Sequence, residues 1–242
     1  MTKHNYKIMV CISENSREKE LQYIDLLYSH RVLGIVVCSH IGETMEHLDS
    51  NCPLISFERE IAENIPAVLC DNYQGGILAA NRLFDAGCRN IAIFNQPTKE
   101  NIPAYSREKA FMKCCEDKKI SGRVVYTDRL APLSEEFGNN ILELLKKNSD
   151  LDGIFATSDV MAANIIRACK KMGKRVPEDI SIVGFDDTWI STLTYPSITT
   201  IHQPVQEMCE YAIEAIVKKV KSEKVPSQVV FPVELIDRES TK

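Results

Sequence analysis

Several polar side chains stand directly behind short apolar runs of the sequence. Ser158 and Asp159 follow the run 153–157, Asp186 and Asp187 follow 180–185, and Gln203 follows 199–202. Arg107 comes after the loop that follows the run 91–95. If these runs are parallel strands, the polar groups gather outside the carboxyl ends of a sheet, where open α/β sheets bind their ligands. Carboxylate, amide, hydroxyl and guanidinium groups can pair with the hydroxyl groups of a sugar. The pattern predicts a binding site for a small polar molecule.

Some of these residues also have an ordinary structural explanation. Asp favours turns and helix caps, so we expect Asp159 and Asp187 to act mainly as caps or loop organisers. The same explanation competes with ligand contact for Asp186, and a surface position at the start of a helix competes with it for Arg107. For these two residues ligand contact is the preferred interpretation.

A second group of candidates is open to more than one role. Gln203 fits either a hydrogen bond at a hinge or a ligand contact. Tyr73 and Gln74 follow the apolar run 67–70 and are candidates for the edge of the site. Trp189, the only tryptophan, fits either stacking on a ligand or a contact between subunits.

Catalytic motifs are absent from the sequence. The five histidines lack the H-E-x-x-H spacing, and neither a G-x-S-x-G turn nor a phosphate- or dinucleotide-binding glycine motif occurs. Asp186 and Asp187 are adjacent, and neighbouring residues do not readily aim at one bond. We therefore expect a binding protein rather than an enzyme, with no metal and no cofactor.

Composition indicates a globular protein outside the membrane. The chain has 242 residues and a net charge of −5, with 26% charged residues and no basic cluster, so this chain alone is expected to bind little DNA. No apolar run approaches the ~20 residues of a membrane span, and the N-terminus has no signal-peptide pattern. The nine cysteines are scattered without a C-x-x-C, which favours reduced thiols and a cytoplasmic location.

Strand-like and helix-like segments alternate along the chain. The expected strands are 7–12, 32–38, 53–57, 67–70, 91–95, 124–127, 153–158, 180–185, 199–203 and 229–235. Many are apolar almost throughout, as strands covered on both faces are. Apolar residues at spacings of three and four predict helices around 21–28, after Ser134 and around 208–220. This alternation predicts an α/β fold with parallel sheets.

Five segments then carry a resemblance to a known family. They are 32–37 (VLGIVV), 87–92 (GCRNIA), 152–159 (DGIFATSD), 173–187 (GKRVPEDISIVGFDD) and 195–204 (YPSITTIHQP). Their order and spacing resemble the LacI/GalR family of bacterial transcription regulators along nearly the whole chain. One such segment would be a weak signal, whereas five in the right order are specific.

The resemblance implies a fold of two doubly wound lobes, the type I periplasmic-binding-protein fold, with a ligand cleft between them. The implied first lobe comprises 1–86 and 205–229, and the second comprises 87–204 and 230–242. The implied crossings lie near Ala86–Gly87, near 203–205 and just after Val229.

The resemblance also assigns roles to single residues. Arg107 occupies the position of the effector-binding arginine, although Ala110 stands where the family carries glycine. Asp186 matches the effector carboxylate and Gln203 a glutamine of the cleft. Ser158 stands where many members carry asparagine, which leaves the effector's identity open. Trp189 and Tyr195 lie in the stretch 189–196, which contributes to dimer contacts in this family.

The match departs from the family pattern at its start. No helix-turn-helix precedes it, and the first strand and helix of the sensing domain are not found. We expect a shortened first lobe that is completed by strand rearrangement or by a partner chain, because a missing strand would leave its neighbours' backbone groups unpaired.

The function implied is effector sensing in a LacI-type regulator, most plainly a repressor. A small polar effector such as a sugar would bind between the lobes of a homodimer and control DNA binding by a separate headpiece. The alternative is the solute-binding protein of a sugar transporter, which shares the fold but needs export.

Overall fold

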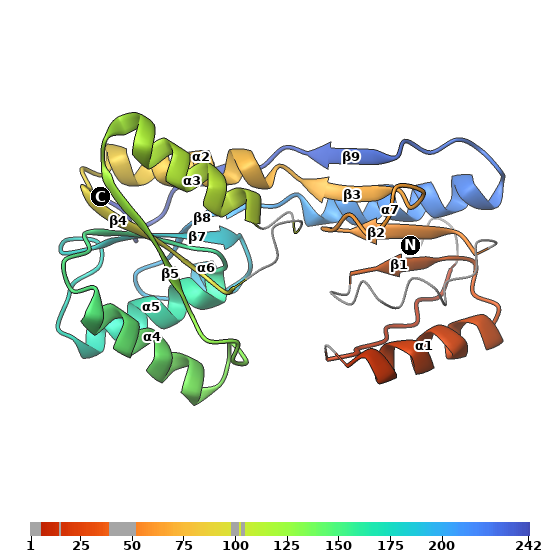
Figure 1. The fold of residues 1–242 in the computed structure, drawn as a ribbon, viewed down its shortest axis with the longest axis horizontal. Helices are drawn as coiled ribbons and strands as arrows, with labels where there is room; N and C mark the ends of the chain where they lie inside the picture. Colours follow the sequence, from red (N-terminus) through yellow and green to blue (C-terminus); the bar gives the residue numbers. More distant parts are fainter. Residues whose placement is uncertain (1–5, 15, 39–51, 98–101, 103–104) are drawn as a thin grey trace. The chain divides into compact units, whose positions relative to one another are not determined.

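A computed structural model describes residues 6–14, 16–38, 52–97, 102 and 105–242. The chain divides into two compact units (Figure 1). The first unit is Met1–Cys70 with Pro204–Phe231, and the second is Asp71–Gln203 with Pro232–Lys242. Among the described residues no helix is long and apolar enough to cross a membrane.

The first unit contains a four-stranded, entirely parallel sheet with the strand order β1-β2-β3-β9. Its strands are β1 (Ile35–Val37), β2 (Leu54–Phe57), β3 (Ala67–Cys70) and β9 (Gln228–Phe231), and its helices are α1 (Arg17–Ser29) and α7 (Val205–Val220). Ser16 caps α1, since its side chain accepts a hydrogen bond from the backbone N–H of Lys19. Helix α7 lies against the start of β1, where a Cβ on Gly34 would come 2.6 Å from the Ile216 side chain.

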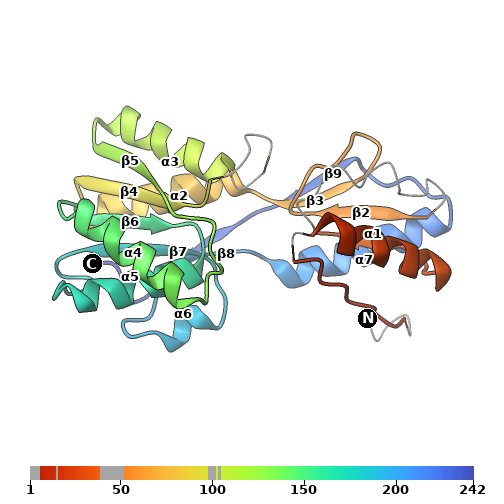
Figure 2. The same ribbon diagram turned by 60° about the horizontal axis from the view of Figure 1, so that its bottom comes forward.

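The second unit contains a six-stranded sheet with the order β10-β8-β7-β6-β4-β5, in which only β10 is antiparallel to its neighbour. Its strands are β4 (Asn90–Asn95), β5 (Ser121–Tyr126), β6 (Gly153–Ala156), β7 (Ser181–Asp186), β8 (Thr199–His202) and β10 (Glu234–Ile236). Its helices are α2 (Asn72–Asp85), α3 (Tyr105–Lys118), α4 (Glu135–Lys147), α5 (Asp159–Lys171) and α6 (Ile190–Leu193). Helices α2 and α3 lie on one side of this sheet and α4 and α5 on the other (Figure 2).

Both faces of the second sheet are packed. Ile154 and Ala156 of β6 join the buried cluster formed with Phe137, Ile141 and other residues of α4 and α5. Phe155, between them, points to the opposite face, where its ring lies 5.8 Å from that of Phe111 and 6.4 Å from that of Phe185. Alternation of side chains between two covered faces explains why these strands are apolar throughout. The predicted α/β fold with parallel sheets is confirmed.

The first crossing between the units lies earlier in the chain than the expected division has it. The chain leaves the first unit after Cys70, before the expected crossing near Ala86–Gly87, and α2 belongs to the second unit. Two glycines on α2 explain this placement. A Cβ on Gly76 would come 2.3 Å from the Arg107 carbonyl oxygen, and a Cβ on Gly75 would come 2.6 Å from the Phe185 ring, so α2 packs closely against α3 and β7.

Two strand predictions need correction. Residues 7–12 are not a strand: Ile8, Val10 and Ile12 are 58%, 78% and 68% exposed, and within the described residues this segment pairs with no other strand. The run 229–235 forms two strands, β9 and β10, which belong to different units. Pro232 lies between them, and proline has no N–H to continue a ladder.

Candidate ligand-binding site

The six residues predicted to bind a ligand all belong to the second unit. Asp186 ends β7 and Gln203 follows β8, while Ser158 lies between β6 and α5. Arg107 lies in the first turn of α3, as Tyr73 and Gln74 do in α2. These positions are the carboxyl ends of strands and the amino ends of helices, as the sequence pattern predicted.

Arg107 is buried and held in one orientation. It is 7% exposed. Its Nε donates to Asn72 Oδ1 (2.6 Å) and its Nη1 to the Thr157 carbonyl oxygen (2.9 Å). The guanidinium carbon lies 3.4 Å from the centre of the Phe185 ring, a cation–π contact. The start of α2, the end of β6 and the end of β7 thus converge on one side chain.

A second set of hydrogen bonds fixes the first turn of α3. The buried Glu108 accepts hydrogen bonds from Asn95 Nδ2 (2.9 Å) and from the Tyr126 hydroxyl (2.8 Å). Thr157 Oγ1, in turn, donates to Asn95 Oδ1 (3.2 Å). The hydrogen bond to Glu108 is the main reason why the pKa of Tyr126 rises to about 12. Because Glu108 adjoins Arg107 in the chain, this network ties the helix start to the ends of β4, β5 and β6.

Asp186 and Gln203 form a direct pair. Gln203 Nε2 donates to Asp186 Oδ1 at 2.6 Å. The two residues come from neighbouring parallel strands, in which Asp186 is level with His202. Asp186 also directly follows Phe185, and the Arg107 guanidinium stacks over the Phe185 ring. The structure therefore connects three of the predicted residues, Arg107, Asp186 and Gln203, through adjacent positions at one sheet edge.

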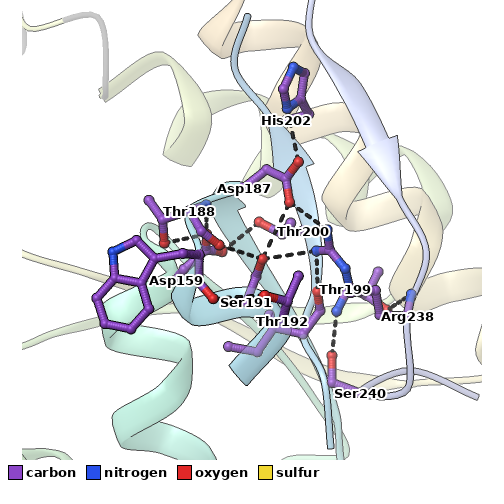
Figure 3. Close-up of polar contacts among 12 residues, drawn as sticks. Asp159, Asp187, Thr188, Ser191, Thr192, Thr199, Thr200, His202, Arg238 and Ser240 are labelled. Atoms are coloured by element: carbon purple, nitrogen blue, oxygen red, sulfur yellow. Dashed lines mark hydrogen bonds and ion pairs between the residues drawn. The ribbon is translucent and has the colours of Figure 1, made fainter. Parts of the chain in front are cut away.

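The neighbouring residues Asp187 and His202 hold the loop after β7 in place (Figure 3). Asp187 Oδ1 accepts from Arg238 Nη2 (2.6 Å), and Asp187 Oδ2 lies 2.9 Å from His202 Nδ1. Burial alone would raise the pKa of Asp187, but the hydrogen bonds from Arg238 and His202 hold it below its usual value. The second Arg238 nitrogen, Nη1, donates to the Ile198 carbonyl oxygen (2.9 Å). Asp187 is thus a loop organiser, the role expected for it from the sequence.

Ser158, Tyr73 and Gln74 are less closely tied to this group. Ser158 is the N-cap of α5, and its Oγ accepts a hydrogen bond from the backbone N–H of Met161 (3.2 Å). Tyr73 is 37% exposed, and Gln74 is exposed with its backbone N–H bound to Asp71 Oδ1 (2.9 Å). No hydrogen bond found among the described residues links these three side chains to Arg107 or Asp186.

Sequence reasoning missed the residues that orient Arg107. These are Asn72, Phe185 and the Thr157 carbonyl group. Asn72 offered a signal, because a polar residue follows the apolar run 67–70 just before Tyr73 and Gln74. Phe185 and a backbone carbonyl offered none, since their contact with Arg107 depends on how the helices pack.

Two predicted dimer residues are strongly exposed. Trp189 is 71% exposed and Tyr195 is 90% exposed, and Leu193 between them is 72% exposed. Trp189 directly precedes α6, Leu193 ends it and Tyr195 follows it, and we call these three exposed residues the α6 patch.

Comparison with known proteins places this geometry in a family. The family described as "periplasmic binding protein-like domain" matches residues 80–241. The ribose operon repressor of Halalkalibacterium halodurans is 31% identical over 240 residues, which are 99% of this chain and 71% of the repressor. The sucrose operon repressor of Streptococcus mutans is 29% identical over 238 residues, or 98% of this chain and 72% of that protein.

Solved structures agree with these relatives. A periplasmic binding protein/LacI transcriptional regulator from Alkaliphilus metalliredigens, complexed with D-xylulofuranose, is 32% identical with a TM-score of 0.87, and the match covers 100% of this chain and 90% of that one. A LacI family transcriptional regulator from Enterococcus faecium with bound ribose is 25% identical with a TM-score of 0.85, covering 99% and 89% of the two chains. The chain belongs to the LacI family of transcription regulators and carries its periplasmic-binding-protein-like effector domain.

Proposed function

We propose that this chain senses a sugar through Arg107, Asp186 and Gln203, and that the bound sugar controls DNA binding by a helix-turn-helix domain, as in a repressor. The observations that carry the proposal are a buried guanidinium oriented by Asn72, Thr157 and the Phe185 ring, and a hydrogen-bonded carboxylate–amide pair that begins with the residue after Phe185. Arg107 lies at the amino end of α3 and binds the backbone just after β6, and the pair lies at the carboxyl ends of β7 and β8 of the same sheet. A regulator of this kind would work in the cytoplasm, where its operator is.

The hydrogen-bonding capacity of these groups suits a polyhydroxylated ligand. A guanidinium has five N–H groups, and Arg107 uses two of them on Asn72 and Thr157. Asp186 supplies carboxylate oxygens, and Gln203 supplies an amide that both donates and accepts. A sugar hydroxyl also donates and accepts, so vicinal hydroxyls can bridge such a set. We assign Ser158, Tyr73 and Gln74 to the edge of the same site, since the cap of α5 uses the Ser158 oxygen only as an acceptor.

The relatives narrow the ligand class. Two of them are named ribose and sucrose operon repressors, and two structurally similar regulators hold D-xylulofuranose and ribose. We therefore propose a pentose or a related small sugar as the effector. Only a ligand with unequal affinity for two conformations can shift a regulator between them.

Calorimetric titration with ribose, xylulose and sucrose tests this site. Asp186→Ala should weaken binding of the active sugar at least about tenfold, because a hydrogen bond to a charged group in a partly buried site is worth about 1.5–3 kcal/mol. Asp150→Ala is the matched control, since Asp150 is exposed and pairs with Arg123 outside the site. Equal affinity in the Asp186→Ala and wild-type proteins would remove Asp186 from the site.

We further propose that the protein binds its sugar without converting it. The family members named above are regulators, and the proposed site holds its ligand by hydrogen bonds alone. Nuclear magnetic resonance of the sugar after prolonged incubation should show the starting compound only. A new product that disappears in the Asp186→Ala variant would contradict this proposal.

The α6 patch is proposed to take part in a homodimer. Trp189, Leu193 and Tyr195 together expose aromatic and aliphatic surface of the kind enriched at interfaces. In sedimentation, Trp189→Ser with Tyr195→Ser should shift the protein towards monomer. Leu133→Ser is the control, because Leu133 is 85% exposed but lies outside the patch. An unchanged association constant in the double variant would exclude the patch from the interface.

A further inference from the structure

Asp159 is a fully buried carboxylate outside the group of proposed ligand contacts. It is 0% exposed and is the first residue of α5. Its Oδ2 accepts hydrogen bonds from the Thr188 backbone N–H (2.6 Å) and Thr188 Oγ1 (3.1 Å), and its Oδ1 accepts one from Thr200 Oγ1 (2.6 Å) (Figure 3). One side chain thus connects α5 with the loop after β7 and with β8.

Close packing against β7 fixes where this carboxylate lies. A Cβ on Gly184 would come 2.5 Å from Asp159 Oδ1 and 3.2 Å from Thr200 Oγ1. No side chain fits there, so glycine at position 184 allows Asp159 to reach the strand that ends in Asp186. The Asp159 carboxylate therefore packs against the backbone of β7 at Gly184, two residues before the proposed binding residue Asp186.

The backbone that follows has an uncommon conformation. Asp186 has φ of 104° and Asp187 has φ of 55°. Non-glycine residues seldom adopt positive φ, and they keep it only where surrounding interactions hold them. The next residue is Thr188, whose N–H and hydroxyl both bind Asp159. The turn is thus anchored by Gln203 at the Asp186 side chain and by Asp159 immediately after Asp187.

We infer that Asp159 is a positioning residue for the ligand: it holds Thr188, and with it the turn at Asp186 and Asp187, so that the Asp186 carboxylate points at the sugar. This inference rests on the proposed role of Asp186 in binding. Asp159 acts through that residue and does not itself touch the ligand.

Burial makes the charged form of Asp159 less favourable than it is in water. Burial raises the pKa of Asp159 despite its three hydrogen bonds. When the pKa of a carboxyl group is higher in the folded than in the unfolded state, the free energy of unfolding falls as the pH rises from the unfolded-state pKa to the folded-state pKa. Ionisation of Asp159 therefore makes the folded state less stable than it would be with the neutral carboxyl group. Asp159 contributes to the geometry of the turn, because it accepts two hydrogen bonds from Thr188.

Two isosteric changes test the inference by calorimetry and amide hydrogen exchange. Asp159→Asn places an amide where two donors of Thr188 meet, and we expect about tenfold weaker sugar binding. Thr200→Val removes one hydrogen bond but no volume, and serves if the Asn variant does not fold. It should weaken binding about three- to tenfold, a range typical of residues in one hydrogen-bond network. The Thr188 amide should exchange faster in both variants.

The controls separate positioning from a general structural effect. Thr200→Ser keeps the hydroxyl and should restore both affinity and exchange. Thr192→Val makes the same chemical change in α6, where the single hydrogen bond of the hydroxyl within the described residues goes to the Trp189 carbonyl oxygen (2.9 Å), and should change neither. In an Asp186→Ala background Thr200→Val should have little further effect on sugar binding, because it acts through Asp186.

The inference is overturned if Thr200→Val leaves both affinity and Thr188 exchange at wild-type values. It is also overturned if Thr200→Val weakens binding equally with and without Asp186. If the wild-type protein binds no sugar in the panel, the proposed function fails, and Thr188 exchange in Asp159→Asn and Thr200→Val then decides alone whether Asp159 holds the turn.

Discussion

The first and second units are built from the same parallel strand–helix pattern, but they cover their sheets to different extents. In the second unit β4 and β6 are buried on both faces, and Phe94, Phe155 and Phe185 are 0% exposed. In the first unit β3 is buried throughout and β2 nearly so, but β1 has one buried residue of three, and Val10 in the segment 7–12 is 78% exposed. All the proposed ligand contacts are in the second unit. A sheet packed on both faces gives side chains at its strand ends little freedom, which suits a site that must hold one geometry.

The largest effect is expected from a substitution that creates a cavity in the core of the second unit. Phe155→Ala removes a fully buried ring that lies between Phe111 and Phe185. Its loss should lower the free energy of unfolding by about 3–5 kcal/mol. Urea unfolding followed by circular dichroism measures the change. A loss below about 1 kcal/mol would show that the second sheet is packed no better than the exposed parts of the first unit.

A middle-sized effect is expected at the anchor of the α6 loop. Arg238→Met removes the hydrogen bonds to Asp187 and to the Ile198 carbonyl oxygen and should cost about 2 kcal/mol near pH 7. Because the pKa of Asp187 is lowered in the folded state, its contribution is complete above the pKa of the unfolded chain. It is lost as the pH falls through the lower, folded-state pKa.

The difference between Arg238→Met and wild type should therefore shrink below about pH 4. Unfolding free energies measured at several pH values would show this. A difference that stays constant down to pH 3 would mean that Asp187 is not the group through which Arg238 stabilises the loop.

The smallest effect is expected in the exposed segment of the first unit. Val10→Thr replaces one β-branched side chain by another at a position that is 78% exposed. The unfolding free energy should change by less than about 0.5 kcal/mol, as for most surface substitutions. A loss of 2 kcal/mol or more would show that this segment is packed in solution, and would remove the contrast between the units.

Sequence patterns predicted the second unit better than the first for a physical reason. Runs such as 153–158 and 180–185 are apolar because each strand is covered on both faces, so the pattern records the packing directly. Ser134 signalled the start of α4, and its side chain does accept from the Phe137 N–H (3.1 Å). Residues 7–12 are also mostly apolar but have no partner among the described strands. High β-propensity reflects packing against neighbours, and without them it does not make a strand.

The types and order of residues are enough to predict the α/β fold, the family, and the positions of Arg107 near a helix start and of Asp186 and Gln203 at strand ends, because these follow from local periodicity and short motifs. Other features depend on contacts between segments far apart in sequence. These are the side chains that orient Arg107, the place where the chain first passes between units, and the hydrogen bonds from Thr188 to Asp159. The bond from Thr200 to Asp159 spans 41 positions, and no local pattern contains such a distance. Close packing of whole helices and strands brings these groups together, and it exists only once the sheet has formed.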